Sequence, residues 1–198
     1  MNRAELSEIN LLWKPLRPYL MRQIRDLYGR TDGDVLEIGP FSGLIFAFAQ
    51  ENVGDSFTVA AFPEETLSLL KDEADSLHLT GTVTIRPSNP SLHGIPDEAF
   101  DLVIFRGALF FPGLFDADFR AVYRVLSPGG LAFVGGGFGS YTPPDVVAKI
   151  RDRSKELNLA MGKVGIDPDG LRRTLAGIGL SDRSSVITDG GLWVVLRK

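Results

Sequence analysis

The sequence predicts an α/β fold on a doubly wound, mostly parallel sheet of seven strands, ending in an antiparallel C-terminal hairpin. Three observations support this prediction. From residue 34 onward, short apolar runs alternate with segments of helical periodicity, which is typical of a parallel sheet covered by helices. The run Phe100–Phe105 is largely apolar on both faces, as in a buried parallel strand. Residues 189–191 (Asp-Gly-Gly) join two final strand-like runs as a hairpin turn does.

The first element, residues 5–28, is predicted to be helical. Its apolar residues recur every three or four positions and therefore share one face; they are Leu11, Leu12, Leu16, Tyr19, Leu20, Ile24 and Leu27. Pro15 and Pro18 predict a kink or a break between two helical pieces, because proline disrupts a helix interior. Gly29 ends the segment, and a turn over residues 31–34 follows.

The remaining elements follow in order along the chain. Strands are predicted at residues 34–38, 57–62, 83–86, 100–105, 131–134, 183–188 and 192–196. Helices are predicted at residues 44–51, 64–77, 115–125, 144–159 and 169–178. Ser127–Gly130 is expected to end one helix and to turn into the next strand. No repeat or linker marks a second domain, so the 198 residues are predicted to form one domain.

The composition argues against several classes of function. The formal net charge of -4 and the pI of about 5.2 give no electrostatic reason to expect nucleic-acid binding. The sequence contains no cysteine, and His78 and His93 do not have the spacing of metal ligands, so no metal site is predicted. No export signal and no run of eighteen apolar residues is found. The sequence therefore predicts a cytoplasmic protein without membrane attachment.

The loops after the strands are the expected place for a ligand, because open α/β sheets bind ligands at the carboxyl ends of their strands. These loops are residues 39–43, 62–65, 88–91, 105–111 and 135–141. The first of them is rich in glycine and follows a strand that ends with an acid, Glu37.

Three segments carry a resemblance to a known family. Glu37–Gly43 (EIGPFSG) resembles the E/D-x-G-x-G-x-G loop of class I S-adenosylmethionine-dependent methyltransferases. Ile95–Ile104 (IPDEAFDLVI) and Phe119–Gly130 (FRAVYRVLSPGG) are similar to two later segments of that family, in its order and spacing. The resemblance implies a Rossmann-like fold, S-adenosylmethionine as cofactor, a helical lid at residues 1–30 and an α/β core at residues 31–198.

The resemblance also implies which residues contact the cofactor. They are Glu37, Gly39, Phe41, Gly43, Phe62, Asn89, Phe105 and Arg106. Glu37 is expected near the amino group of the ligand, the alternative being a cap or an ion pair at the strand end. Phe62 is expected on the adenine ring or on the sheet. Arg106 is expected on a carboxylate or phosphate group, or in a salt bridge with Glu37 or Asp101.

Two positions depart from the pattern of the family. Phe41 stands where the middle glycine is expected, and its ring needs space that the cofactor would occupy unless it points away. Ala61 stands where the family usually has the acid that binds the ribose hydroxyls. Glu64 or Glu65 replaces that acid only if the loop is displaced. Losing one charge-assisted hydrogen bond weakens binding by roughly 10- to 150-fold.

Other residues at the strand ends have two interpretations each. Four phenylalanines either line an apolar substrate pocket or pack in the core: Phe110, Phe111, Phe115 and Phe138. The N-terminal helix that carries Trp13, Tyr19 and Arg22 is either a lid over the substrate or a plain core helix. His93 is either a catalytic base or, more often in such loops, a solvated side chain, and Gly135–Gly137 either approach a substrate or form a turn. No residue is assigned a catalytic role.

Three functions are compatible with these features. The first is an S-adenosylmethionine-dependent methyltransferase acting on a small molecule, because methyl transfer needs mainly the positioning of donor and acceptor. The second is a degenerate member of the family that no longer binds the cofactor and acts as a ligand-binding protein, a homodimer or a partner subunit. The third is a nucleotide-linked dehydrogenase, which the absence of GxGxxG spacing disfavours.

Overall fold

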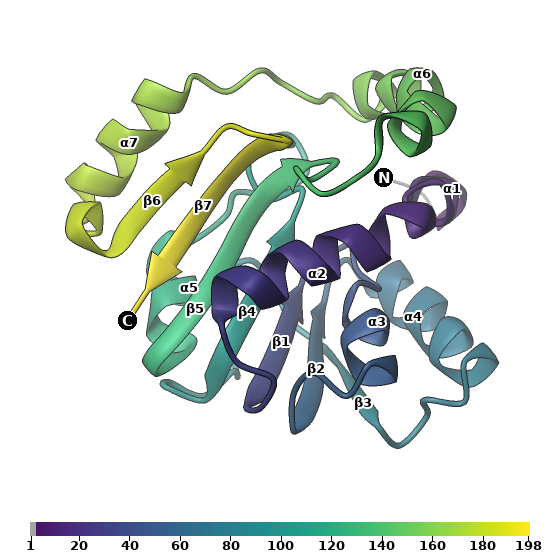
Figure 1. The fold of residues 1–198 in the computed structure, drawn as a ribbon, viewed down its shortest axis with the longest axis horizontal. Coiled ribbons are helices and arrows are strands. Elements are labelled where there is room, and N and C mark those ends of the chain that lie inside the picture. The colour runs from purple at the N-terminus through teal and green to yellow at the C-terminus, as the bar shows by residue number, and fades with distance from the viewer. Residues whose placement is uncertain (1–2) are drawn as a thin grey trace.

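The computed structural model describes residues 3–198 and contains one seven-stranded sheet (Figure 1). Its strands are β1 (Asp34–Ile38), β2 (Ser56–Ala61), β3 (Val83–Pro87), β4 (Phe100–Arg106), β5 (Leu126–Gly137), β6 (Ser184–Ile187) and β7 (Gly191–Arg197). Their order is β3-β2-β1-β4-β5-β7-β6. Strands β1 to β5 pair in parallel, whereas β7 pairs antiparallel to both β5 and β6. The predicted fold class is confirmed.

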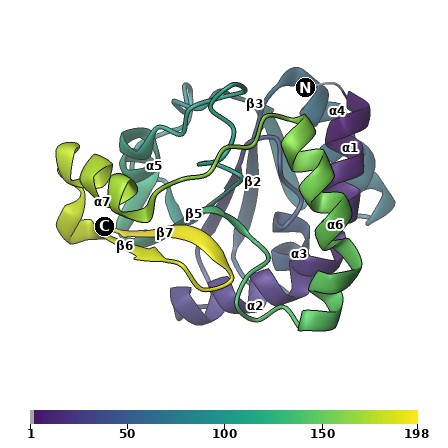
Figure 2. The ribbon, with the colours of Figure 1, turned by 90° about the horizontal axis from the view of Figure 1, so that it is seen from above.

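Helices cover both faces of this sheet, with α2 and α3 on one side and α5 on the other (Figure 2). The α-helices are α1 (Arg3–Leu12), α2 (Arg17–Tyr28), α3 (Ile45–Gln50), α4 (Glu64–Ser76), α5 (Phe119–Val125), α6 (Pro144–Ala160) and α7 (Pro168–Gly177). Two short 3-10 helices, η1 (Lys14–Leu16) and η2 (Ser181–Arg183), complete the order. Because the strands are buried between helices, Leu36, Val103 and Phe133 are fully buried.

The N-terminal segment breaks where its prolines predict. Pro15 lies in η1 and Pro18 lies in the first turn of α2, where the missing N–H of proline costs nothing. α1 lies beside α6 (Figures 1 and 2), and the two are joined by an ion pair between Glu8 and Arg153. α2 instead packs on the sheet through fully buried leucine and isoleucine side chains, Leu20 and Ile24 among them. Of the predicted lid at residues 1–30, residues 1–2 lie outside the described part of the chain.

The register brings the expected site together at one edge of the sheet. Glu37 on β1 stands between Val59 on β2 and Ile104 on β4. The chain continues outward from β1 to β2 and β3, and then returns to the other side of β1 with β4. The crevice between the ends of β1 and β4 is therefore the topological switch point, where ligands bind in such sheets.

Two predicted boundaries are wrong by four residues or more. The helix predicted from residue 115 begins at Phe119, because the side chain of Asp118 caps it by accepting a hydrogen bond from the N–H of Ala121. The segment Ser127–Gly130 does not separate a helix from a strand. It lies inside β5, which begins at Leu126 and pairs with β4 through a register shift between Phe100 and Leu102. A bulge accommodates the glycine pair without ending the strand.

Two kinds of feature are absent from the described residues. Over residues 3–198, no helix combines the length and the apolar character needed to cross a bilayer. Within the same residues, no three His, Cys, Asp or Glu side chains gather where they could hold a metal ion.

Candidate functional site

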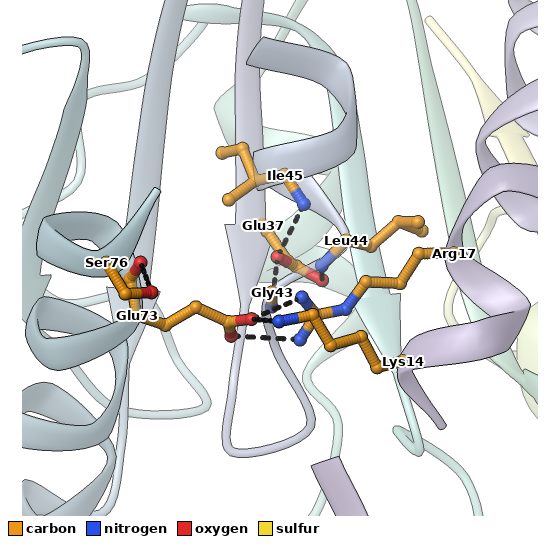
Figure 3. A network of polar contacts seen from close by, with 8 residues as sticks. All are labelled: Lys14, Arg17, Glu37, Gly43, Leu44, Ile45, Glu73 and Ser76. Carbon is orange, nitrogen blue, oxygen red and sulfur yellow. Dashed lines mark hydrogen bonds and ion pairs between the residues drawn. The ribbon is translucent and has the colours of Figure 1, made fainter. Parts of the chain in front are cut away.

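Glu37 is fully buried at the end of β1 and acts as a cap for the next helix. Its carboxylate accepts hydrogen bonds from the backbone N–H groups of Gly43 (2.8 Å), Leu44 (3.1 Å) and Ile45 (3.0 Å) (Figure 3). These amides lie at the start of α3, where N–H groups have no partner within the helix. Burial raises the pKa of Glu37 above that of an ordinary glutamate, although the amides of Ile45 and Gly43 and the nearby arginines, Arg106 and Arg17, oppose this effect.

An ion-pair network lies directly over the glycine loop. The buried guanidinium of Arg17 donates two hydrogen bonds to the carboxylate of Glu73 on α4, at 2.7 and 3.0 Å, and the ammonium of Lys14 lies 3.0 Å from the same carboxylate (Figure 3). A Cβ atom on Gly43 would stand 2.2 Å from Nη2 of Arg17. The space above this glycine is thus filled by an arginine of the same chain.

The substitution Glu73→Gln is expected to destabilise the protein by about 2 kcal/mol. A buried ion pair that loses one partner leaves an uncompensated charge, and in this pair that charge is partly solvated. Burial alone would raise the pKa of Glu73, but hydrogen bonds and charge from Arg17 and Lys14 hold the pKa below its ordinary value. The stability from this carboxylate is therefore present above the ordinary pKa and is lost as pH falls through the lowered one.

Urea unfolding of the wild type and of Glu73→Gln at pH 7 and at pH 3 measures this difference. The difference between the two proteins should be largest at pH 7. Asp72→Asn on the same helix is the control, because the ion pair of Asp72 with Arg3 is exposed and should contribute little. Equal losses for the two variants would contradict the structural role of the network.

Six aromatic side chains fill the crevice at the switch point, and we call them the aromatic cluster. They are Trp13, Phe41, Phe62, Phe105, Phe111 and Phe115. Phe41 is fully buried at their centre, with its ring centroid 5.5 Å from that of Trp13 and 4.9 Å from that of Phe111. Phe105 stacks on Phe115 at 5.7 Å. Such contacts stabilise a structure beyond the burial of apolar area.

The glycines of the site approach these rings. Gly39 has a φ of +94°, and a Cβ atom there would stand 2.8 Å from the ring of Phe105. Gly107 has a φ of +71°, and a Cβ atom there would stand 2.2 Å from the ring of Phe41. The missing side chains therefore make room for neighbouring aromatic and arginine groups of this chain.

The residues at the crevice differ from those that the resemblance implies for S-adenosylmethionine. Glu37 is fully engaged by three amides, Phe41 occupies the crevice, and Arg17 covers Gly43. At the end of β2, Ala61 offers no acceptor for ribose hydroxyls. Of the two departures noted in the sequence, Phe41 therefore fills the crevice and Ala61 leaves the end of β2 without an acceptor.

A hollow of about 300 Å³ lies beyond the cluster, at the ends of β2 and β3. Phe62, Asn89 and Phe115 line it, together with Glu65. Asn89 is exposed, and its side-chain oxygen accepts a hydrogen bond from the N–H of His93, so it holds its own loop. Of the two acids considered as replacements for the ribose acid, Glu65 lines this hollow whereas Glu64 does not.

Arg106 lies on the other side of the cluster, at the end of β4. Its side chain is 4% exposed, and its guanidinium carbon lies 5.2 Å from the ring centroid of Trp13. Among residues 3–198, no hydrogen bond or ion pair holds the guanidinium, so neither of the expected salt bridges, to Glu37 or to Asp101, forms. Burial lowers the pKa of Arg106 to about 10, with Arg17 contributing and Glu37 opposing.

The other candidate phenylalanines lie around the crevice. Phe110 and Phe138 line a small cavity beside Arg106, Phe115 belongs to the aromatic cluster, and Phe111 belongs to both. His93 is exposed in its loop. Gly135–Gly137 lie within β5 and pair with β7, with Gly136 and Gly137 at the cavity wall.

Five polar side chains around this edge were not predicted as site residues: Arg17, Glu73, Ser154, Asn158 and Lys163. Arg17 and Glu73 are separated by 56 residues, so no local pattern connects them. Ser154 and Asn158 had a detectable signal. They fall on the buried stripe of α6 with Ile150 and Leu157, and polar residues within such a stripe indicate a specific partner.

Comparison with known proteins agrees with this fold. Residues 36–134, half of the chain, match the family described as "Methyltransferase domain". The structure is similar to a Methanococcus maripaludis protein provisionally described as an S-adenosyl-L-methionine-dependent methyltransferase, with 26% identity, a TM-score of 0.79 and coverage of 99% of this chain and 91% of that one.

Two further structures share the fold. An Aquifex aeolicus SAM-dependent methyltransferase has 14% identity and a TM-score of 0.64, covering 100% of this chain and 97% of its own. PigF, solved with SAH, has 17% identity and a TM-score of 0.54, covering 83% and 50%. No curated protein sequence matches the chain. The chain belongs to the methyltransferase domain family and has the fold of S-adenosylmethionine-dependent class I methyltransferases.

Proposed function

We propose that this chain is a member of the methyltransferase family whose cofactor crevice is closed by its own side chains, and that it acts by binding a small molecule. The burial of Phe41 at the centre of the aromatic cluster carries this proposal. Moving this ring into water would cost about 1.5–3 kcal/mol for its apolar surface alone. A cofactor would have to offset this cost, and the loss of the ring contacts, before it gained any affinity.

The charges at the crevice support the same proposal. S-adenosylmethionine carries a sulfonium, an ammonium and one carboxylate group, so its net charge is positive and an electronegative crevice would suit it. Among residues 3–198, Glu37 is the one buried acid. It accepts three amide hydrogen bonds, and two buried arginines, Arg17 and Arg106, lie near it. The position that would hold the ribose with a carboxylate is Ala61.

The second candidate is an S-adenosylmethionine-dependent methyltransferase acting on a small-molecule acceptor. Family membership favours it, and so does the position of the hollow at the ends of β2 and β3, on the far side of the cluster from the cavity beside Arg106. Donor and acceptor would then lie on opposite sides of Phe41. This function requires Phe41 to leave the crevice on binding. A cytoplasmic location and a homodimeric or partner-bound state remain predictions.

Isothermal titration with S-adenosylmethionine and with S-adenosylhomocysteine separates the two candidates. We expect no measurable heat for the wild type, and binding by the double variant Phe41→Gly/Ala61→Asp, which reopens the crevice and restores the acid. Ala61→Asp alone is the control, because it restores the acid under a closed crevice. Micromolar binding by the wild type would refute the closed crevice and establish the second candidate.

A further inference from the structure

The guanidinium of Arg106 is a buried charge with no anion beside it. Elsewhere in residues 3–198, the buried arginine Arg17 has a carboxylate at 2.7 Å. Arg106 has only the face of Trp13, at 5.2 Å, and the Coulombic influence of Glu37, whose own oxygens are occupied by amides. An unpaired charge in a protein interior is costly, so such a group indicates either a missing partner or a functional site.

Arg106 lines a cavity of about 80 Å³ between the ends of β4 and β5 and helix α6. This space exceeds the roughly 10–15 Å³ that a single water molecule requires, so the cavity can hold a small polar group. Its walls combine aromatic and polar side chains, with Gly136 and Gly137 leaving the backbone of β5 bare. Phe110, Phe111 and Phe138 supply the apolar part.

Helix α6 adds polar groups to the same cavity. The hydroxyl oxygen of Ser154 accepts hydrogen bonds from Nε1 of Trp13 (2.9 Å) and from Nδ2 of Asn158 (3.2 Å). In the described chain, Oδ1 of Asn158 is buried without a hydrogen-bond partner. If the amide is turned over, Ser154 donates to Oδ1, and the two N–H donors of Asn158 become free for an acceptor in the cavity.

Lys163 completes the positive character of this region. Its side chain lines the cavity, with the ammonium 4.7 Å from the ring centroid of Phe110. The cavity therefore presents a buried guanidinium, an amide able to donate and a nearby ammonium, and no carboxylate is among its lining residues.

We propose that this cavity binds the carboxylate of a small organic acid, with Arg106 as its bidentate partner and Asn158 as a second donor. A carboxylate is planar and presents two oxygens side by side, so it matches the fork of a guanidinium. The aromatic walls favour an acid with an apolar body, which would extend toward Phe110 and Phe138.

This site does not depend on the closed crevice. Titration with S-adenosylmethionine reports on Phe41, whereas titration with a carboxylate reports on Arg106, so either proposal can fail while the other holds. The alternative role for Arg106 is structural, as a cation that packs on Trp13. A structural role and a ligand-binding role predict opposite effects on the stability of the ligand-free protein.

The test is thermal unfolding and isothermal titration of the full chain with sodium acetate, sodium benzoate and sodium phosphate, at ionic strength matched with sodium chloride. We expect a saturable rise in Tm of the wild type with benzoate, and a weaker one with acetate. Arg106→Met removes the charge while keeping the apolar length. This substitution should abolish the rise in Tm with benzoate. Without ligand, the variant should unfold at the same Tm as the wild type or higher, because an unpaired buried charge has been removed.

Three further variants sharpen the result. Arg106→Lys keeps the charge but not the fork, and should bind benzoate roughly 10- to 150-fold more weakly. Asn158→Leu should also weaken binding, and Arg120→Met, at an exposed arginine on α5, should bind as the wild type does. The proposal would be overturned by benzoate binding that survives in Arg106→Met, by a response to phosphate alone, by no response to either acid, or by a lower ligand-free Tm of Arg106→Met.

Discussion

Phe41→Ala is expected to lower the free energy of unfolding by about 3–5 kcal/mol, the range for truncating a buried phenylalanine. The ring is fully buried and contacts three other aromatic rings, those of Trp13, Phe111 and Phe115. A loss of this size is a large part of the total stability of a domain. Urea unfolding followed by circular dichroism measures it. A loss below 1 kcal/mol would show that the ring lies outside the crevice in solution.

A second substitution reports the position of the ring directly. A Cβ atom on Gly107 would stand 2.2 Å from the ring of Phe41, and the φ of +71° adds a strain that is independent of that ring. Gly107→Ala should therefore cost much less in the Phe41→Ala background than in the wild type, because only the strain remains. Additive losses in this double-mutant cycle would contradict contact between the two residues.

The fold follows from local patterns in the sequence, which is why most of it could be predicted. Strands buried on both faces are continuous apolar runs, and helices show their three- and four-residue period. The boundaries that failed depend on contacts far away along the chain. Phe115 belongs to the aromatic cluster, so it does not start a helix. The glycine pair at residues 129–130 has the sequence of a turn, but it is held in β5 by backbone hydrogen bonds with Lys198 at the far end of the chain.

The candidate site was predictable only in part, for the same physical reason. Phe41 and Ala61 were visible as departures from a pattern, because the pattern itself is local. The groups that close the crevice and line the neighbouring cavity come from distant segments. Trp13 donates a hydrogen bond to Ser154, which is 141 positions away in the sequence, and Arg17 donates to Glu73, which is 56 positions away. A single sequence does not encode such pairs in its spacing, so Arg106 could be identified as unusual but its lack of a partner could not.

The largest polar effect is expected at Glu37. Glu37→Ala removes the acceptor for three buried amides at the start of α3, and each unsatisfied donor costs about 1–3 kcal/mol. Because water entering the space relieves part of this cost, we expect a loss of about 3–5 kcal/mol. Glu37→Gln keeps one oxygen, which can still accept from Gly43 and Ile45, so its loss should be smaller. If Glu37→Ala lowered the free energy of unfolding no more than Glu37→Gln does, the capping role would be wrong.

The pH dependence of Glu37→Gln tests the burial of the carboxylate. Burial raises the pKa of Glu37 in the folded chain above the ordinary value of 4.5. The folded protein therefore binds this proton more tightly than the unfolded chain, and stability from this group falls as pH rises from 4.5 through the raised pKa. Glutamine has no such proton.

The wild type should therefore become more stable relative to Glu37→Gln as pH is lowered from 7 toward 4.5. Below pH 4.5 the difference between their free energies of unfolding should stop growing. Urea unfolding of both proteins across this range measures the difference, in which contributions from the other titrating groups cancel. A difference that shrinks on acidification would mean that the amides and arginines around Glu37 outweigh its burial, and the crevice would then be more electropositive than its buried acid suggests.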